Sequence, residues 1–179
     1  VITWNEEGIQ YEADQRHAEI IIHQLGMSNG AKGSKSVVTP GNKISADDLE
    51  FWENPLPENQ HTFYRGMAAR AMYLAQDRGD ISYAAKEISR GMSKPTEGEM
   101  RNLKRLGRYL IGRERMGTEW NYQEGVNVLD VWTDTDHAGC LRTRKSTTAG
   151  VVMFGNHFVK SWSITQGVIA LSSGESEYY

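Results

Sequence analysis

Three stretches in the middle of the chain repeat apolar residues with the 3.6-residue spacing of amphipathic helices. The first, about 59–76, places on one stripe Tyr64, Met67, Ala68, Ala71, Met72 and Ala75. The second begins near Asp80, which we expect to cap it, and aligns Ile81, Ala84, Ala85 and Ile88. The third follows a Thr96–Glu99 capping box and aligns Met100, Leu103, Leu106 and Leu110. Together they predict a compact helical unit.

The first 26 residues predict a strand hairpin followed by a helix. Strand-like segments at 1–4 and 9–12 flank a turn that ends in Gly8. A helix is expected to begin at an Asp14 cap and to close at Gly26. Residues 27–45 are rich in Gly, Ser, Lys and Asn and predict a linker. Residues 47–54 predict one helical turn before Pro55.

From Thr118 onward the pattern changes to that of strands. We expect strands at 120–123, 126–134, 147–154 and 158–163, with a turn at 155–156. A short apolar run at 168–171 leads to a helix start at Ser172. Antiparallel strands followed by a helix that packs on their sheet predict an α/β or α+β domain.

Composition excludes several classes of protein. The 179 residues are 39% hydrophobic and 24% charged, which is ordinary for a globular chain that buries a core. The net charge of −3 gives no general attraction to nucleic acid, so such binding must rest on local basic patches. The single cysteine, Cys140, excludes an internal disulfide and fits a reducing compartment. No apolar run approaches the roughly 18 residues of a membrane-spanning helix.

Carboxylates gather at the end of one strand and at the last helix start. Asp134 and Asp136 share a strand face, because side chains alternate. Glu175 is in capping-box register with Ser172, whereas Glu177 points about 200° away from it and is the better candidate to face the strand acids. Like charges repel unless a cation holds them together, so a divalent metal site is one interpretation. Spacing alone favours the simpler interpretation of the strand acids, as solvated residues at a strand end.

Two hydrolase alternatives are weak. An aspartic protease needs a glycine after Asp-Thr, but Asp136 stands there. Ser176 lacks the second glycine of a nucleophile elbow. His137 and Cys140 are too few for a zinc site, and we expect Cys140 to be a turn residue.

Two basic groups are candidates for phosphate contact. One lies on a helix face opposite the apolar stripe and consists of Arg101, Lys104, Arg105 and Arg108. The other lies in the turn after the strand acids and consists of Arg142, Arg144 and Lys145. A charged stripe opposite an apolar one is commonly a solvated face, so both interpretations stay open.

Several motifs resemble the ribonuclease H domain of Ty1/copia-type retrotransposon polyproteins. They are TDTDHAG at 133–139, TRKSTTAG at 143–150, KSWS at 160–163 and SSGESEY at 172–178. Upstream, MYL at 72–74, RGDI at 78–81, SRGMSKPT at 89–96 and LKRLGRYL at 103–110 resemble the helical connection between reverse transcriptase and that domain. EADQRH at 12–17 resembles the end of the reverse transcriptase region.

The resemblance implies cleavage of the RNA strand of RNA–DNA hybrids by two Mg²⁺ ions, or Mn²⁺, held by four acids. Asp134 matches the first acid and Glu177 the second. Asp136 belongs to the pattern without a clear ligand role, and His137 stands where the family often has tryptophan. The third and fourth acids are expected beyond Tyr179 and the polymerase acids before Val1, so we expect this chain to bind Mg²⁺ weakly and not to turn over.

The resemblance also implies an organisation in three parts. Residues 1–57 would be the end of the reverse transcriptase region with a linker, 58–116 the helical connection, and 117–179 the N-terminal part of a ribonuclease H-like domain. The expected fold is α/β: a truncated ribonuclease H-like mixed sheet preceded by a small helical connection unit and an N-terminal hairpin-helix.

The implied partners are RNA–DNA hybrids and the rest of the Pol polyprotein, including reverse transcriptase and integrase, with no membrane. The implied location is intracellular, in cytoplasmic particles, the nucleus or both. The alternative is a non-enzymatic retroelement remnant that binds nucleic acid or a partner protein through its helical unit.

Overall fold

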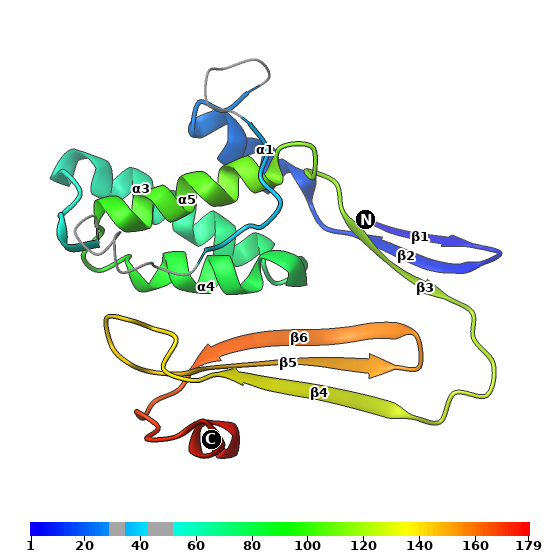
Figure 1. Cartoon of the computed structure of the whole chain (residues 1–179). Helices are drawn as coiled ribbons and strands as arrows, with labels where there is room; N and C mark the ends of the chain where they lie inside the picture. Colours follow the sequence, from blue (N-terminus) through cyan, green and yellow to red (C-terminus); the bar gives the residue numbers. More distant parts are fainter. Residues whose placement is uncertain (29–34, 43–51) are drawn as a thin grey trace. The chain divides into compact units, whose positions relative to one another are not determined.

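The computed structural model describes residues 1–28, 35–42 and 52–179 and divides into two compact units (Figure 1). The helical unit comprises Glu12–Met116. The strand unit combines Val1–Tyr11 with Gly117–Tyr179, so the helical unit lies between its two segments along the chain. The three-part division implied by the resemblance stays a prediction.

The helical unit is built from amphipathic helices that pack on one another. They are α1 (Gln15–Gln24), α3 (Glu58–Leu74), the short 3₁₀ helix η2 (Gly79–Ile81), α4 (Ser82–Arg90) and α5 (Glu97–Leu110). Asp14 caps α1 as expected, since its carboxylate accepts a hydrogen bond from the backbone N–H of Arg16 at 3.0 Å. The Thr96–Glu99 capping box at the start of α5 is also confirmed.

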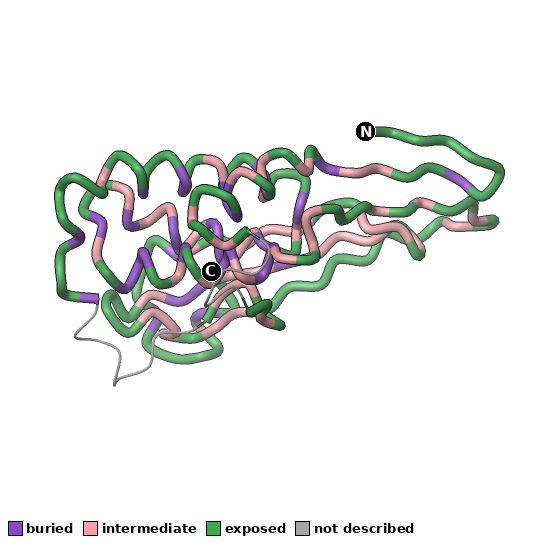
Figure 2. Tube along the Cα trace, turned by 90° about the horizontal axis from the view of Figure 1, so that it is seen from above, coloured by how far each residue is buried: buried purple, intermediate pink, exposed green. Residues whose placement is uncertain are grey.

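One hydrophobic core joins these helices, and Figure 2 shows that buried positions concentrate along them. Its fully buried side chains include Ile21, Tyr64, Ile88, Leu103, Leu106 and Leu110. The Tyr64 hydroxyl donates to the Ile88 carbonyl oxygen at 2.5 Å, which joins α3 to α4. One stripe prediction is wrong: Met72 is 40% exposed, and Leu74 is buried instead.

Two glycines let neighbouring segments approach α5 closely. A Cβ atom at Gly98 would lie 2.7 Å from the Trp52 ring, and one at Gly107 would lie 2.6 Å from Leu25. Real Cβ atoms do not approach other atoms so closely, so a larger residue at either position would displace its neighbour. The helix surface is therefore shaped for Trp52 and for the end of α1.

The predicted linker and helical turn lie partly outside the described residues, which omit 29–34 and 43–51. The described part, 35–42, has no regular secondary structure, as expected, but it is attached to the end of α5. Arg105 donates to the Thr39 hydroxyl at 2.8 Å, and Arg113 donates to the Ser36 hydroxyl at 3.1 Å and to the Val37 carbonyl at 3.3 Å. This segment is part of the packed unit.

Asp80 does not cap α4, which corrects the sequence prediction. Its two carboxylate oxygens accept from Nε and Nη2 of Arg78, each at 2.8 Å, and one also accepts from the Tyr109 hydroxyl at 3.0 Å. Arg78 is only 2% exposed and donates its remaining Nη1 to the Arg113 carbonyl at 2.9 Å. The carboxylate is thus used to neutralise a buried guanidinium.

This network shifts two pKa values. Burial raises the pKa of Asp80. The hydrogen bonds and charge of Arg78, together with the hydrogen bond from Tyr109, lower it by a larger amount, so the net shift is downward. Burial and the nearby Asp80 charge raise the pKa of Tyr109. Both shifts favour the ionised carboxylate and the neutral phenol.

The two ends of the helical unit are joined by an exposed ion pair. Nε and Nη2 of Arg115 donate to the two carboxylate oxygens of Glu12 at 2.6 and 2.7 Å. The hydrogen bond from Arg115 lowers the pKa of Glu12 and raises that of Arg115.

The strand unit contains two three-stranded antiparallel sheets among its described residues. One has the order β1 (Ile2–Asn5), β2 (Gly8–Glu12) and β3 (Gly117–Asn121). The other has the order β4 (Leu129–Asp136), β5 (Thr147–Phe154) and β6 (His157–Thr165), followed by α6 (Ser173–Tyr178). The α/β class is confirmed.

The expected mixed sheet is not observed. The strand expected at 120–123 to open the C-terminal domain is β3, and it lies next to β2 of the N-terminal hairpin. The Trp120 indole N–H also donates to the Phe158 carbonyl of β6 at 2.7 Å, which links the two sheets. No helix among the described residues is long and apolar enough to cross a membrane.

Candidate metal and phosphate site

Asp134 and Asp136 lie near the C-terminal end of β4, an edge strand of its sheet. Asp134 pairs with Ala149 and Asp136 with Thr147, so both acids lie on one face, as alternation predicted. Thr135 lies on the opposite face, across from Thr148. The Asp134 side chain is exposed and available to a ligand.

Asp136 has a structural position in the turn that follows β4. Its carboxylate lies against Gly139 so closely that a Cβ atom there would clash with it. Its carbonyl oxygen also accepts from the Gly139 backbone N–H at 3.3 Å. Asp136 therefore shapes this turn, which gives it a role that the sequence pattern had left open.

Helix α6 carries the second candidate acid. The Ser172 hydroxyl accepts from the Glu175 backbone N–H at 3.1 Å, as expected for an N-cap. The Glu175 carboxylate accepts from the backbone N–H of Leu171 at 2.7 Å, one residue earlier than a capping box requires. Glu177 is exposed, and α6 contacts β4. The two candidate acids therefore come from contacting elements.

The described residues contain no group of three or more His, Cys, Asp and Glu side chains that could hold a metal ion. Two exposed carboxylates nevertheless fit the way Mg²⁺ is often held, by one or two carboxylates together with water and substrate phosphates. The donor set is that of part of a site.

The basic turn between β4 and β5 has an unusual backbone. Ala138 and Arg144 have φ angles of 51° and 56°, which non-glycine residues rarely adopt. The Arg144 backbone N–H donates to the Cys140 carbonyl at 2.7 Å, and the Cys140 N–H donates to the Lys145 carbonyl at 3.2 Å. Cys140 is thus a turn residue, as expected, and Arg142 and Arg144 are exposed.

Lys145 is engaged differently from its neighbours. Its Nζ atom donates to the Gly167 carbonyl oxygen at 2.6 Å, in the segment between β6 and α6. The sequence analysis missed Gln166, the residue before Gly167. Gln166 is buried, and its side chain donates a hydrogen bond to α6. The only signal was an amide between a strand and an apolar run.

The second basic group lies on α5, in the helical unit. Arg101 and Lys104 are exposed, and Arg105 and Arg108 are half-buried. The Nε atoms of Arg105 and Arg108 are buried without a hydrogen-bond partner among the described residues. No acidic residue follows Glu99 on this helix, so its outer face is positive.

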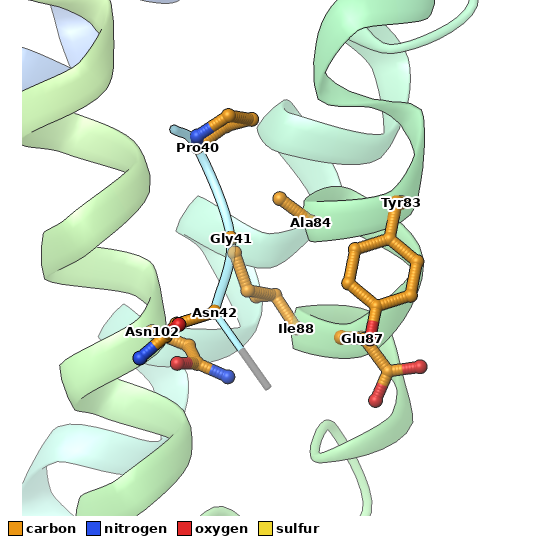
Figure 3. Close-up of a pocket in the computed structure, with 8 residues that line it drawn as sticks. All are labelled: Pro40, Gly41, Asn42, Tyr83, Ala84, Glu87, Ile88 and Asn102. Atoms are coloured by element: carbon orange, nitrogen blue, oxygen red, sulfur yellow. The ribbon is translucent and has the colours of Figure 1, made fainter. Parts of the chain in front are cut away.

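A small hollow in the helical unit is not a candidate site. Figure 3 shows residues 40–42 beside α4 and α5, with Tyr83, Glu87 and Asn102 near them. Glu87, the one ionisable acid there, already pairs with Lys86 at 2.8 Å and with Arg90 at 3.0 Å. The hollow therefore offers no free charged group.

The chain is similar to three kinds of known protein. It is 37% identical over 119 residues to the retrovirus-related Pol polyprotein from transposon RE1 of Arabidopsis thaliana, which covers 65% of this chain and 8% of that protein. It is 31% identical over 164 residues to an uncharacterized mitochondrial protein of the same plant, covering 91% of this chain and 64% of that protein. It is 32% identical over 116 residues to secreted RxLR effector protein 161 of Plasmopara viticola, and the match covers 64% of this chain and 81% of that protein.

No family model matches the chain, and no solved structure matches it. The Pol relatives are much longer, since the chain spans 8% of the RE1 polyprotein. Pol polyproteins of two further plant transposons are 35% and 30% identical to it. Over 64–65% of its length the chain is thus a homologue of one segment of the retrovirus-related Pol polyproteins of copia-type plant transposons.

Proposed function

We propose that this chain contributes part of a ribonuclease H site to its polyprotein, with Asp134 and Glu177 as two of the metal-binding acids. The observation that carries the proposal is the contact between α6 and β4, because β4 contains Asp134 and α6 contains Glu177. Both side chains are exposed, as ligands of a substrate-bound ion need to be.

The bound ions would be Mg²⁺, or Mn²⁺, and would activate water and stabilise charge at the scissile phosphate. The chain's own residues would hold those ions and orient the substrate. Arg142 and Arg144 are exposed in the turn that follows the Asp134 strand, where guanidinium groups can contact phosphates. Lys145 could join them only by leaving the Gly167 carbonyl.

The substrate would be the RNA strand of an RNA–DNA hybrid. Duplexes containing RNA are recognised through 2′-hydroxyls and phosphates more than through base sequence. The partners would be the remaining Pol segments, including reverse transcriptase and integrase, inside the cell in cytoplasmic particles or the nucleus. Further acids would come from outside this chain, so we expect the chain alone to bind Mg²⁺ weakly.

The test is cleavage of a labelled RNA–DNA hybrid by a Pol protein that contains this chain. Asp134→Asn and Glu177→Gln should each lower the rate on the order of 100-fold, because each removes a charge from the metal site. Asp130→Asn is the matched control, since Asp130 is exposed on the same strand and face. Undiminished cleavage by Asp134→Asn would overturn the proposal.

A second candidate function is metal-independent binding of nucleic acid by the helical unit. The positive outer face of α5 favours it, because its cations follow one another without an acid after Glu99. A relative matched over 81% of its length is named as an effector and not as a polymerase. Neutralising the four basic residues of this face should abolish a gel shift in EDTA; a shift that needs divalent metal would refute this function.

A further inference from the structure

We infer that Gln166 is the positioning residue that holds α6, and with it Glu177, against the β4–β5–β6 sheet. The inference rests on the proposed function for its catalytic consequence, but its structural part stands by itself. Gln166 directly follows β6 and is 6% exposed, although glutamine is mostly found at the surface. Burying an amide is costly unless its groups are hydrogen-bonded. The Gln166 Nε2 atom has two acceptors, whereas its Oε1 atom is buried without a hydrogen-bond partner among the described residues.

The Gln166 amide connects β5 and α6, which are not consecutive along the chain. Its Nε2 atom donates to the Thr148 hydroxyl on β5 at 3.0 Å and to the Ser176 carbonyl on α6 at 2.7 Å. Its backbone N–H donates to the Ser146 carbonyl at 2.9 Å, which fixes the amide at the base of the basic turn. The acceptor on α6 belongs to the residue directly before Glu177.

Apart from its contact with β4, α6 makes mostly internal hydrogen bonds. Ser176 is its buried residue, and the Ser176 hydroxyl bonds within the helix to the Ser173 carbonyl at 2.7 Å. Tyr178 and Leu171, on either side, are exposed. Within the described residues, the other hydrogen bonds of α6 stay within residues 171–179, so the Gln166–Ser176 bond is the one that joins α6 to the end of β6.

The adjacent residue carries a second attachment. The Gly167 carbonyl accepts from Lys145, so the basic turn is held at the position next to Gln166. The turn with the candidate phosphate contacts and the helix with Glu177 therefore share one anchor at residues 166–167. Loosening this anchor should move an acid without removing it.

The test uses Gln166→Leu, which keeps the size of the side chain and removes its donors. Hydrogen exchange of the α6 amides in the chain as it exists should accelerate about tenfold, while amides of β4, β5 and β6 keep their protection. Gln123→Leu is the matched control: the Gln123 amide donates to Phe154 at 2.8 Å and accepts from Asn156 at 3.0 Å, with no bond to α6. Unchanged α6 exchange in Gln166→Leu would overturn the inference.

A second variant covers the case in which Gln166→Leu does not fold. Gln166→Glu keeps an acceptor, and it can donate to Ser176 only when its carboxyl is protonated. Exchange of α6, relative to the parent chain at the same pH, should therefore be fast at neutral pH and approach the parent value as the carboxyl is protonated. A pH-independent ratio would count against the inference.

Cleavage assays separate this inference from the proposed function. In a Pol protein that cleaves hybrids, Gln166→Leu should lower kcat with little change in KM. The acid is displaced, whereas the backbone groups of residues 166 and 167 still hold the basic turn with its phosphate contacts. Unchanged kcat with faster α6 exchange would refute the link to Glu177. If the parent protein cleaves no hybrid, the proposed function fails, and hydrogen exchange still decides the role of Gln166.

Discussion

The pair of Arg78 and Asp80 allows the sharpest prediction about the helical unit. Replacing Asp80 with Asn keeps the shape of the side chain and removes its charge. The Arg78 guanidinium, which is 2% exposed, would then lose its charged partner. Its hydrogen bond to the Arg113 carbonyl oxygen at 2.9 Å would remain. An uncompensated buried charge is costly, so we expect Asp80→Asn to destabilise the helical unit.

The magnitude follows from burial. Removing one partner of a buried ion pair costs about 3–5 kcal/mol. Because the Asp80 side chain is 22% exposed, water can partly replace it, and we expect the lower end, about 3 kcal/mol. At a urea m-value of about 1–3 kcal/mol/M, the midpoint should fall by roughly 1–3 M.

Urea unfolding followed by circular dichroism at 222 nm is the appropriate assay, since the helices lie mostly in this unit. Asp77→Asn is the matched control, because Asp77 is exposed and lies just three residues earlier. It should change stability by less than about 0.5 kcal/mol.

Two results would refute this reasoning. One is an Asp80→Asn protein as stable as the Asp77→Asn control. The other concerns the double variant Arg78→Met with Asp80→Asn, which removes both charges and should be more stable than Asp80→Asn alone. If it is less stable, the buried charge was not the source of the cost.

Three further predictions concern stability. Gly98→Ala should lower the free energy of unfolding by about 1–3 kcal/mol, because the new Cβ atom would clash with the Trp52 ring. Gly66→Ala on α3 faces open space and should raise it by up to about 1 kcal/mol. Equal effects of the two variants in urea denaturation would contradict this prediction. Thr96→Ala should cost about 1 kcal/mol by removing the cap of α5, measured in the same way. The pKa of Asp80 is lower in the folded chain than in the unfolded chain. The stabilisation that ionised Asp80 provides is therefore complete above the unfolded pKa of about 3.9 and is lost as the pH falls through the lower folded pKa. The free energy of unfolding, measured from pH 7 to 2.5, should fall more steeply in the parent than in Asp80→Asn.

The helices and their caps could be predicted from sequence because their determinants are local. Asp14 and Thr96 cap helices within three residues of themselves, and apolar spacing identified the buried faces of α4 and α5. Asp80 was predicted wrongly because an equally short-range partner, Arg78, binds its carboxylate more strongly than a helix end does.

The remaining features depend on contacts between distant residues. The position of β3 beside β2 is set by pairing across the whole helical unit, which no local pattern encodes. At the candidate site, alternation gave the common face of Asp134 and Asp136, and capping separated Glu175 from Glu177. The bond from Gln166 to α6 could not be predicted, because a glutamine has the same local signature on a surface as in a core.

The placement of β3 next to β2 has a consequence for the order in which the chain folds. During synthesis β2 must wait until the helical unit has been made before its partner emerges, and closing so long a loop in a disordered chain costs entropy that grows with its length. A helical unit that folds first, with Glu12 and Arg115 joined at its ends, delivers the two strands as near neighbours. The helical unit thus acts as a template for the first sheet, and a slow-folding helical unit should delay β-sheet formation in a part of the chain that it does not itself contain.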